Sequence, residues 1–89
     1  MTKTVAATAQ LRAGLYQHYK GPYYQLIDTV RHSETDELLV LYRALYGDFG
    51  LWVRPVTMFT EQVQTETGLK PRFAFVSATV PAVLSPQAS

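Results

Sequence analysis

The chain has 89 residues, 47% of them hydrophobic and 12% aromatic, and it contains no cysteine. This length supports one modest core, which excludes two domains, a doubly wound nucleotide-binding fold and a large barrel. The lack of cysteine excludes disulfides, thiolate metal sites and cysteine nucleophiles. Eight basic residues against seven acidic ones leave a net charge of +1, so no long-range attraction to nucleic acid is expected.

The chain shows no membrane or export signal. No apolar run approaches the roughly 18–20 residues that span a bilayer. Residues 1–10 lack the apolar core of a secretory signal. We therefore expect a cytoplasmic protein that does not bind membranes.

Turn-forming residues divide the chain into short segments. Every aromatic residue lies between Tyr16 and Phe75. The two ends are rich in small residues or proline, so we expect one domain over 13–77 with flexible tails at 1–12 and 78–89. Runs of β-branched and aromatic residues between the turns predict short strands. In chain order these strands are Leu15–Lys20, Tyr23–His32, Glu37–Tyr46, Leu51–Arg54 and Arg72–Ser77.

One segment, Val56–Val63, has a helical period. Pro55 fits the first helical position, and Met58, Phe59 and Val63 would share one face. The sequence therefore predicts a single helical turn or a short helix there.

These elements predict a mainly β fold, a small SH3-like barrel or roll of about five antiparallel strands with one short helical turn near 56–63. The alternative is an α+β layer in which 56–63 packs as a full helix on an open sheet. The short helical segment and the closely spaced turns favour the first. The continuous apolar run Leu38–Tyr42 is expected to be the central strand, buried on both faces.

Alternation along the strands assigns side chains to faces. Trp52 and Arg54 fall on one face of their strand, and Tyr42 and Tyr46 share a face of another. Arg43 falls among leucines on the opposite face. If it is buried there, it needs a carboxylate or a ligand anion as its partner.

Several uncommon residues form short motifs along the chain. They are His-Tyr-Lys-Gly at 18–21, His-Ser-Glu-Thr at 32–35 and Trp-Val-Arg-Pro at 52–55, followed by Met-Phe at 58–59. Further marked positions are Gly14, Tyr16, Tyr24, Val40, Tyr42, Leu45, Tyr46, Gly47, Gly50, Arg72 and Phe73. In their order and spacing these residues resemble a small bacterial family known only as a domain of unknown function. The resemblance covers 14–73 and implies an SH3-type roll. It implies no activity, cofactor or partner.

The stretch His32-Ser33-Glu34-Thr35 is the densest group of chemically active side chains. The pattern His-x-Glu also occurs in zinc deaminases, but their zinc site needs cysteine ligands, and this chain has no cysteine. A serine hydrolase is disfavoured because no nucleophile elbow is present, and His32 and Ser33, adjacent on a strand, point to opposite faces. The hydroxyls of Ser33 and Thr35 are more simply explained as closing a turn.

A metal site remains an open alternative. It would combine His18 and His32 with Glu34 or Glu37 in a small metal-assisted hydrolase or nucleotide-processing enzyme. The two histidines fall on neighbouring predicted strands, so we expect that they can approach each other.

The favoured hypothesis is a non-catalytic binding or accessory module, with no metal or cofactor, that recognises a peptide, nucleotide or nucleic acid. Aromatic rings offer flat faces, and arginine and histidine donate hydrogen bonds to anionic or planar ligands. The alternative for most rings is that they fill the core. A third hypothesis is a structural domain that forms a small homo-oligomer rather than a monomer. The candidate binding residues are His18, His32, Ser33, Glu34, Tyr42, Arg43, Tyr46, Trp52 and Arg54.

Overall fold

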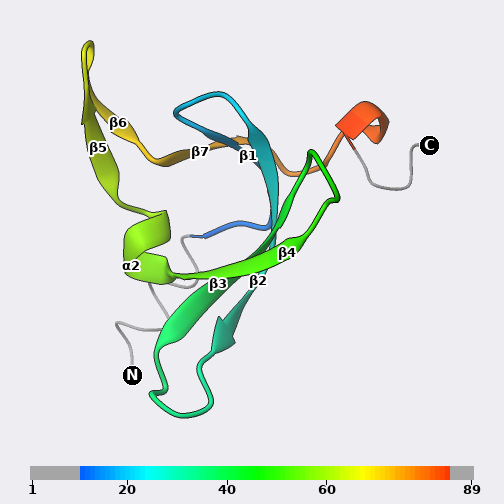
Figure 1. Cartoon of the computed structure of the whole chain (residues 1–89), viewed down its shortest axis with the longest axis vertical. Coiled ribbons are helices and arrows are strands. Elements are labelled where there is room, and N and C mark those ends of the chain that lie inside the picture. Colours follow the sequence, from blue (N-terminus) through cyan, green and yellow to red (C-terminus); the bar gives the residue numbers. More distant parts are fainter. Residues whose placement is uncertain (1–10, 85–89) are drawn as a thin grey trace.

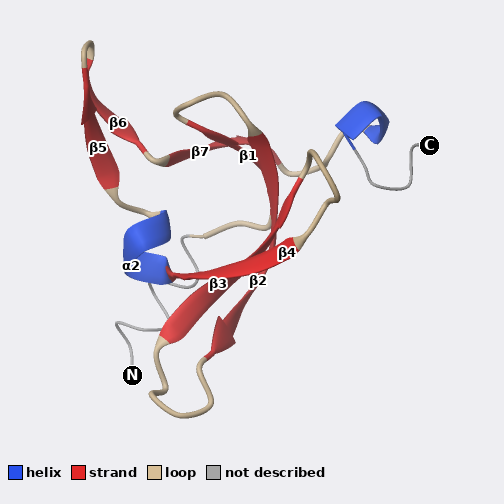
Figure 2. Cartoon of the chain, viewed as in Figure 1, coloured by secondary structure: helices blue, strands red, loops and turns tan. Residues whose placement is uncertain are grey.

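A computed structural model describes residues 11–84 and shows a five-stranded antiparallel sheet, a separate two-stranded hairpin and two short helical segments (Figures 1 and 2). The mainly β prediction is therefore confirmed. The large sheet contains β1 (Gly14–His18), β2 (Tyr23–Arg31), β3 (Leu38–Ala44), β4 (Leu51–Pro55) and β7 (Phe73–Ser77). The hairpin contains β5 (Gln62–Thr65) and β6 (Gly68–Pro71), and the helical segments are α2 (Val56–Phe59) and the 3-10 turn η1 (Ala82–Leu84).

The large sheet has the order β4-β3-β2-β1-β7, with every neighbouring pair antiparallel. The first four strands form a meander. The chain then passes through α2 and the β5–β6 hairpin, which projects away from the sheet, and returns as β7 beside β1 (Figure 1). In the described part of the chain β4 and β7 are the two edges, so the sheet does not close into a barrel. The sheet is curved, as Figure 1 shows.

All five predicted strands are present, with ends that differ by at most two residues. The predicted alternation is confirmed by the register, which pairs Tyr42 with Trp52 and Val40 with Arg54. The prediction that Leu38–Tyr42 is the central strand is wrong. The middle strand is β2, and Leu39 and Leu41 on β3 are only partly buried.

The helix predicted over 56–63 ends at Phe59. Thr60 closes it, because both its backbone N–H and its hydroxyl donate to the carbonyl of Val56. Residues Gln62–Thr65 then alternate between exposed and half-buried, which is the period of a strand and not of a helix. A two-residue turn leads into β6, whose first residue Gly68 has φ +115°. Gly68–Pro71 therefore forms the second strand of a hairpin, where the sequence predicted no strand.

The core lies on one face of the large sheet, here called the inner face. Its buried residues are Tyr16, Leu26, Val40, Tyr42, Phe59 and Phe73. Phe59 comes from α2 and stacks flat on Phe73, with ring centroids 4.2 Å apart and an interplanar angle of 1°. Its neighbour Met58 is exposed, so the helix covers the sheet with a single ring and not with the predicted face of three residues.

Where β1 meets β7, Gly14 has φ +143°. A Cβ atom at this position would collide with the backbone carbonyl of Ser77. The two strands therefore approach each other at a place that only glycine permits. Next to it, the register between β1 and β7 shifts at Leu15/Tyr16.

Residues just outside the strands also contact the core. Leu11 packs against the core cluster, and the guanidinium of Arg12 lies 3.9 Å from the ring centre of Phe75. The predicted flexible tails fall partly on 1–10 and 85–89, outside the described residues, and stay a prediction. Within 11–84, no helix is long and apolar enough to cross a membrane.

Candidate functional site

The helix α2 covers only one end of the inner face, and the other end is hollowed. This open-end hollow has a volume of about 280 Å³. Its lining residues are Tyr24, Tyr42, Ala44, Tyr46, Gly47, Asp48, Trp52 and Arg54. The structure thus brings together four of the candidate binding residues, Tyr42, Tyr46, Trp52 and Arg54.

Strand register places these side chains on one surface. Tyr24 on β2 is opposite Ala44 on β3, and Tyr42 is opposite Trp52 on β4. Arg54 follows Trp52 by two residues, so it lies on the same face, about 7 Å further along the strand. The floor and one wall of the open-end hollow are therefore fixed by strand pairing.

The rim comes from the turn between β3 and β4. Ala44 donates its N–H to the carbonyl of Gly50 at 3.0 Å, and Phe49 donates to the carbonyl of Tyr46 at 3.1 Å. Gly47 and Phe49 both have positive φ, at 62° and 57°. This tight turn presents Tyr46, Gly47 and Asp48 along one side of the hollow.

Two tyrosines form a hydrogen-bonded pair in the wall. The hydroxyls of Tyr24 and Tyr46 are 2.7 Å apart, and their rings meet edge to face with centroids 5.6 Å apart. Burial, and then the bond to Tyr46, raise the pKa of Tyr24 to about 12. Tyr24 therefore keeps its proton at neutral pH and acts as a wall and hydrogen-bonding group, not as a base.

Arg54 supplies the positive charge of the hollow. Its Nε donates to the hydroxyl of Tyr42 over a long 3.4 Å, and its guanidinium carbon lies 5.8 Å from the ring centre of Phe73. The ion pairs within residues 11–84 are Arg31–Asp36 and Arg72–Glu61, so in this part of the chain Arg54 has no carboxylate within 4 Å. Arg54 can therefore donate to an incoming anion.

His18 lies beside the open-end hollow without lining it. Its ring is 6.3 Å from that of Tyr24 and 5.0 Å from that of Phe73. Its Nδ1 accepts the backbone N–H of Lys20 at 3.1 Å. Burial lowers the pKa of His18 below its usual 6.5, and the charges of Arg72, Lys20 and Arg54 lower it further.

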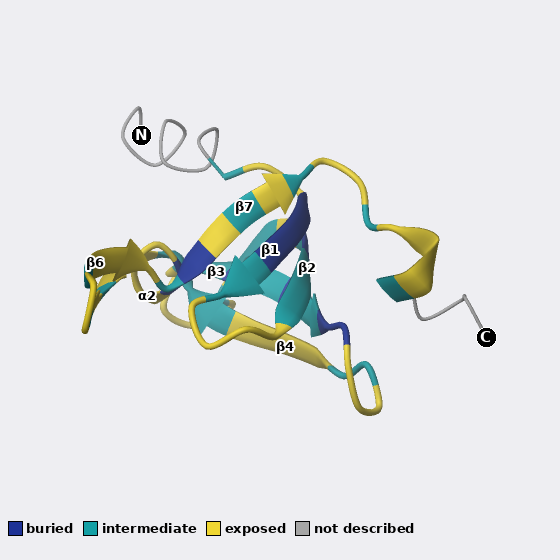
Figure 3. Cartoon of the chain, turned by 90° about the horizontal axis from the view of Figure 1, so that it is seen from above, coloured by how far each residue is buried: buried dark blue, intermediate teal, exposed yellow. Residues whose placement is uncertain are grey.

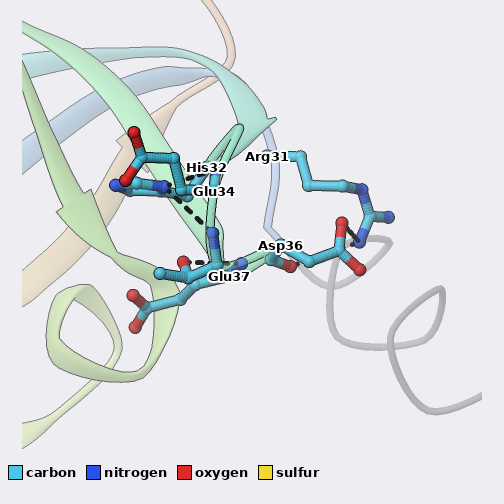
Figure 4. A network of polar contacts seen from close by, with 6 residues as sticks. Arg31, His32, Glu34, Asp36 and Glu37 are labelled. Carbon is cyan, nitrogen blue, oxygen red and sulfur yellow. Dashed lines mark hydrogen bonds and ion pairs between the residues drawn. The ribbon is translucent and has the colours of Figure 1, made fainter.

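His32 belongs to the β2–β3 turn, which Figure 4 shows. Its Nδ1 accepts the backbone N–H groups of Glu34 at 3.1 Å and Thr35 at 3.3 Å, and Arg31 pairs with Asp36 at 3.2 Å. The ring therefore stabilises its own turn. His32, Ser33 and Glu34 are not brought to the open-end hollow.

The expectation that His18 and His32 approach each other is wrong. His18 packs against Tyr24, at the start of β2, and His32 comes eight residues later, about 25 Å along an extended strand. Neighbouring antiparallel strands bring residues together only where the register pairs them. Correspondingly, residues 11–84 contain no group of three or more histidine and acidic side chains placed to hold a metal ion.

Arg43 lies on the opposite face of β3, away from the open-end hollow. Its Nη1 donates to the backbone carbonyl of Phe49 at 2.8 Å. The partner of this half-buried arginine is thus a carbonyl, and not the carboxylate or ligand anion that the sequence suggested. Through this bond Arg43 stabilises the 45–50 turn from the outer side of the sheet. This turn positions the rim of the open-end hollow.

Four lining residues of the open-end hollow, Tyr24, Ala44, Gly47 and Asp48, were not among the candidates from the sequence. The position of Tyr24 could have been predicted from the sequence. The short Gly-Pro turn at 21–22 joins the first two strands and brings the start of β2, with Tyr24, beside the end of β1. The position of Asp48 could not have been predicted, because the direction of its side chain in the turn depends on the φ values of Gly47 and Phe49.

Comparisons with known proteins agree on one family. The sequence profile of a family described as "Protein of unknown function (DUF1653)" matches residues 14–75. A crystal structure of a DUF1653 protein from Bordetella bronchiseptica superposes with a TM-score of 0.76 and 38% sequence identity, covering 83% of this chain and 97% of that one. No protein of curated function is significantly similar to the chain.

Proposed function

The chain belongs to the DUF1653 family, and from this premise, which assigns no chemistry, we propose that it is a non-catalytic binding module. Its ligand site is the open-end hollow. The ligand carries an anionic group, which Arg54 binds, and a flat or apolar part, which lies on Trp52 and the tyrosine walls. Peptides, nucleotides and nucleic acids can all present this combination.

One observation carries the proposal. A cation without a carboxylate partner in the described part of the chain shares a concave surface with an exposed indole ring. Arg54 donates one long hydrogen bond to a tyrosine hydroxyl, and Trp52 is 59% exposed. Large exposed aromatic rings beside an unpaired arginine are typical of binding sites, because they gain most from burial against a ligand.

Two features favour binding over catalysis. Tyr24, which is hydrogen-bonded in the wall, holds its proton with a pKa near 12 and is not poised for acid–base chemistry at neutral pH. The single carboxylate that lines the hollow is Asp48, which lies at the rim. General acid–base catalysis needs a pair of groups with matched pKa values, and the lining of the open-end hollow does not offer such a pair.

We also propose that the domain is an SH3-like module of a bacterial cytoplasm. The curved antiparallel sheet, whose first four strands form a meander, supports the SH3-like description, and the similar crystal structure comes from a bacterium. The cytoplasmic location stays a prediction from the sequence.

Trp52 is the single tryptophan of the chain, so its fluorescence reports directly on the site. Three probes are titrated: AMP, the oligonucleotide dT8, and a blocked peptide containing glutamate and phenylalanine. We expect a saturable change with at least one of them, and a loss of about tenfold or more in affinity for Arg54→Gln. Arg31→Gln is the matched control, because Arg31 lies in the exposed ion pair at the far end of β2.

Two results would overturn the proposal. One is the lack of a saturable fluorescence change with all three probes. The other is equal affinity of the wild-type protein and the Arg54→Gln variant for a probe that does bind.

A further inference from the structure

The edge strand β4 is unusually apolar for an exposed edge. Three successive residues, Leu51, Trp52 and Val53, are 53%, 59% and 54% exposed. Figure 3 shows most of this strand in the colour of exposed residues. Within residues 11–84, β4 pairs only with β3. Exposed apolar edge strands are templates for pairing with another chain, and proteins usually shield them with charge, bulges or short length.

The hydrogen-bond pattern shows which backbone groups are free. Ala44 donates to the carbonyl of Gly50, and the same register continues through Tyr42–Trp52 and Val40–Arg54. In an antiparallel pair the bonded residues alternate, so the N–H and C=O groups of Leu51 and Val53 point outward from the sheet. Pro55 has the same parity and no N–H, which ends the usable edge at its C-terminal side.

The side chains that face the hollow belong to the residues between those with free backbone groups. Trp52 and Arg54 flank the free groups of Val53 and face the open-end hollow, whereas Val53 itself faces the outer side beside Leu41. A strand added along β4 would therefore place every second side chain beside Trp52 and Arg54. The residue between them would lie next to Val53, on an apolar surface.

We propose that an extended acidic peptide binds by adding to the sheet as an antiparallel strand along β4. An acidic side chain lies beside Arg54, an aromatic one lies beside Trp52, and the apolar residue between them exchanges backbone hydrogen bonds with Val53. Read along the peptide, this order is acidic, apolar, aromatic. The inference rests on the proposed function, because it uses the same hollow and adds the backbone contact.

Charge complementarity selects this occupant. Arg54 has no carboxylate within 4 Å in the described part of the chain, whereas Arg72, the other arginine near His18, is already paired with Glu61. A glutamate or aspartate in the added strand would lie next to Arg54 and supply that partner. Strand addition takes its affinity from backbone hydrogen bonds and its specificity from alternate side chains, which are the two features that β4 combines.

The probe is the blocked heptapeptide Ser-Thr-Glu-Val-Phe-Thr-Ser, titrated into the full chain and followed by Trp52 fluorescence and by calorimetry. N-methylation of the peptide valine removes the N–H that would bind the carbonyl of Val53. N-methylation of the peptide phenylalanine is the matched control, because that N–H would point away from β4. We expect about tenfold weaker binding for the first peptide and little change for the second.

A protein variant tests the same contact from the other side. Val53→Pro removes an outward N–H without removing a bond to β3, as Pro55 already does in the same strand. We expect an unchanged circular dichroism spectrum and about tenfold weaker peptide binding. Replacing the peptide glutamate by lysine should weaken binding at least as much.

The outcomes separate this inference from the proposed function. Equal binding of both N-methylated peptides would overturn strand addition and leave the hollow as a side-chain site. Saturation by AMP or dT8 without binding of the heptapeptide would also overturn it, with the hollow retained. If none of the three probes binds, both proposals fail.

Discussion

Both ends of the inner face carry aromatic rings, but only one end is covered, and the open end also carries Arg54 and Asp48. At the covered end, Phe59 of α2 stacks on Phe73 and meets Tyr16 and Tyr42. At the open end, Tyr46 and Trp52 are 50% and 59% exposed. The helix is four residues long and extends over only part of the sheet. On the inner face, the rings that Phe59 contacts are therefore buried, whereas Tyr46 and Trp52 at the open end stay exposed.

The largest expected effect is at the covered end. Phe59 is 1% exposed and is the ring through which α2 packs on the sheet. Phe59→Ala should lower the free energy of unfolding by about 3–5 kcal/mol, because it removes a buried ring and leaves a cavity. Chemical denaturation measures this change. Met58→Ala, in the same helix but exposed, is the control, with an expected change within about 0.5 kcal/mol. Similar losses for the two variants would show that α2 does not act as the cover.

An intermediate effect is expected at the open end, on binding and not on stability. Trp52→Ala should change the free energy of unfolding by less than about 1 kcal/mol, because the ring is mostly exposed and contributes one cross-strand pair with Tyr42. Calorimetric titration with the heptapeptide should show a loss of binding of tenfold or more. A loss of stability comparable to that of Phe59→Ala would mean that the two ends of the inner face do not differ as described.

The smallest expected effect concerns the boundary between the two ends. The pKa of Tyr24 is about 12, so the folded state keeps a proton that the unfolded state loses near pH 10. Its contribution to stability is therefore complete below pH 10 and is lost as the pH rises toward 12. Tyr46→Phe removes the 2.7 Å hydroxyl contact and should lower the pKa of Tyr24. Alkaline titration followed by tyrosinate absorbance measures the shift. Because the variant also loses the absorbance of Tyr46 itself, the readout is the pKa of Tyr24; an unchanged value would show that the bond to Tyr46 does not hold the proton.

Much of the sheet was predictable because strand identity is local. Tyr42, Trp52 and Arg54 were assigned to the correct faces by alternation, and the register confirms these assignments. The β5–β6 hairpin was not predicted. Its alternation covers only Gln62–Thr65 and follows a true helical turn, so the local pattern was ambiguous between two periods.

The candidate site was predictable only in part. Tyr42, Tyr46, Trp52 and Arg54 were grouped by residue type and do meet at the open-end hollow. His32, Ser33 and Glu34 were grouped with them because they are chemically active, yet they form a turn at the other end of the β2–β3 hairpin. The chemical type of a side chain does not determine at which end of the β2–β3 hairpin it lies.

The sequence by itself determined that the fold is mainly β, where the strands of the large sheet lie and which side chains of β3 and β4 share a face, because turns and alternation are properties of neighbouring residues. Only the tertiary structure decided that the sheet stays open, that α2 covers one end of it and that β4 is a free edge beside Arg54. These features depend on how far a four-residue helix reaches and on which strand finds no partner within residues 11–84, and both are set by packing between segments far apart in the chain.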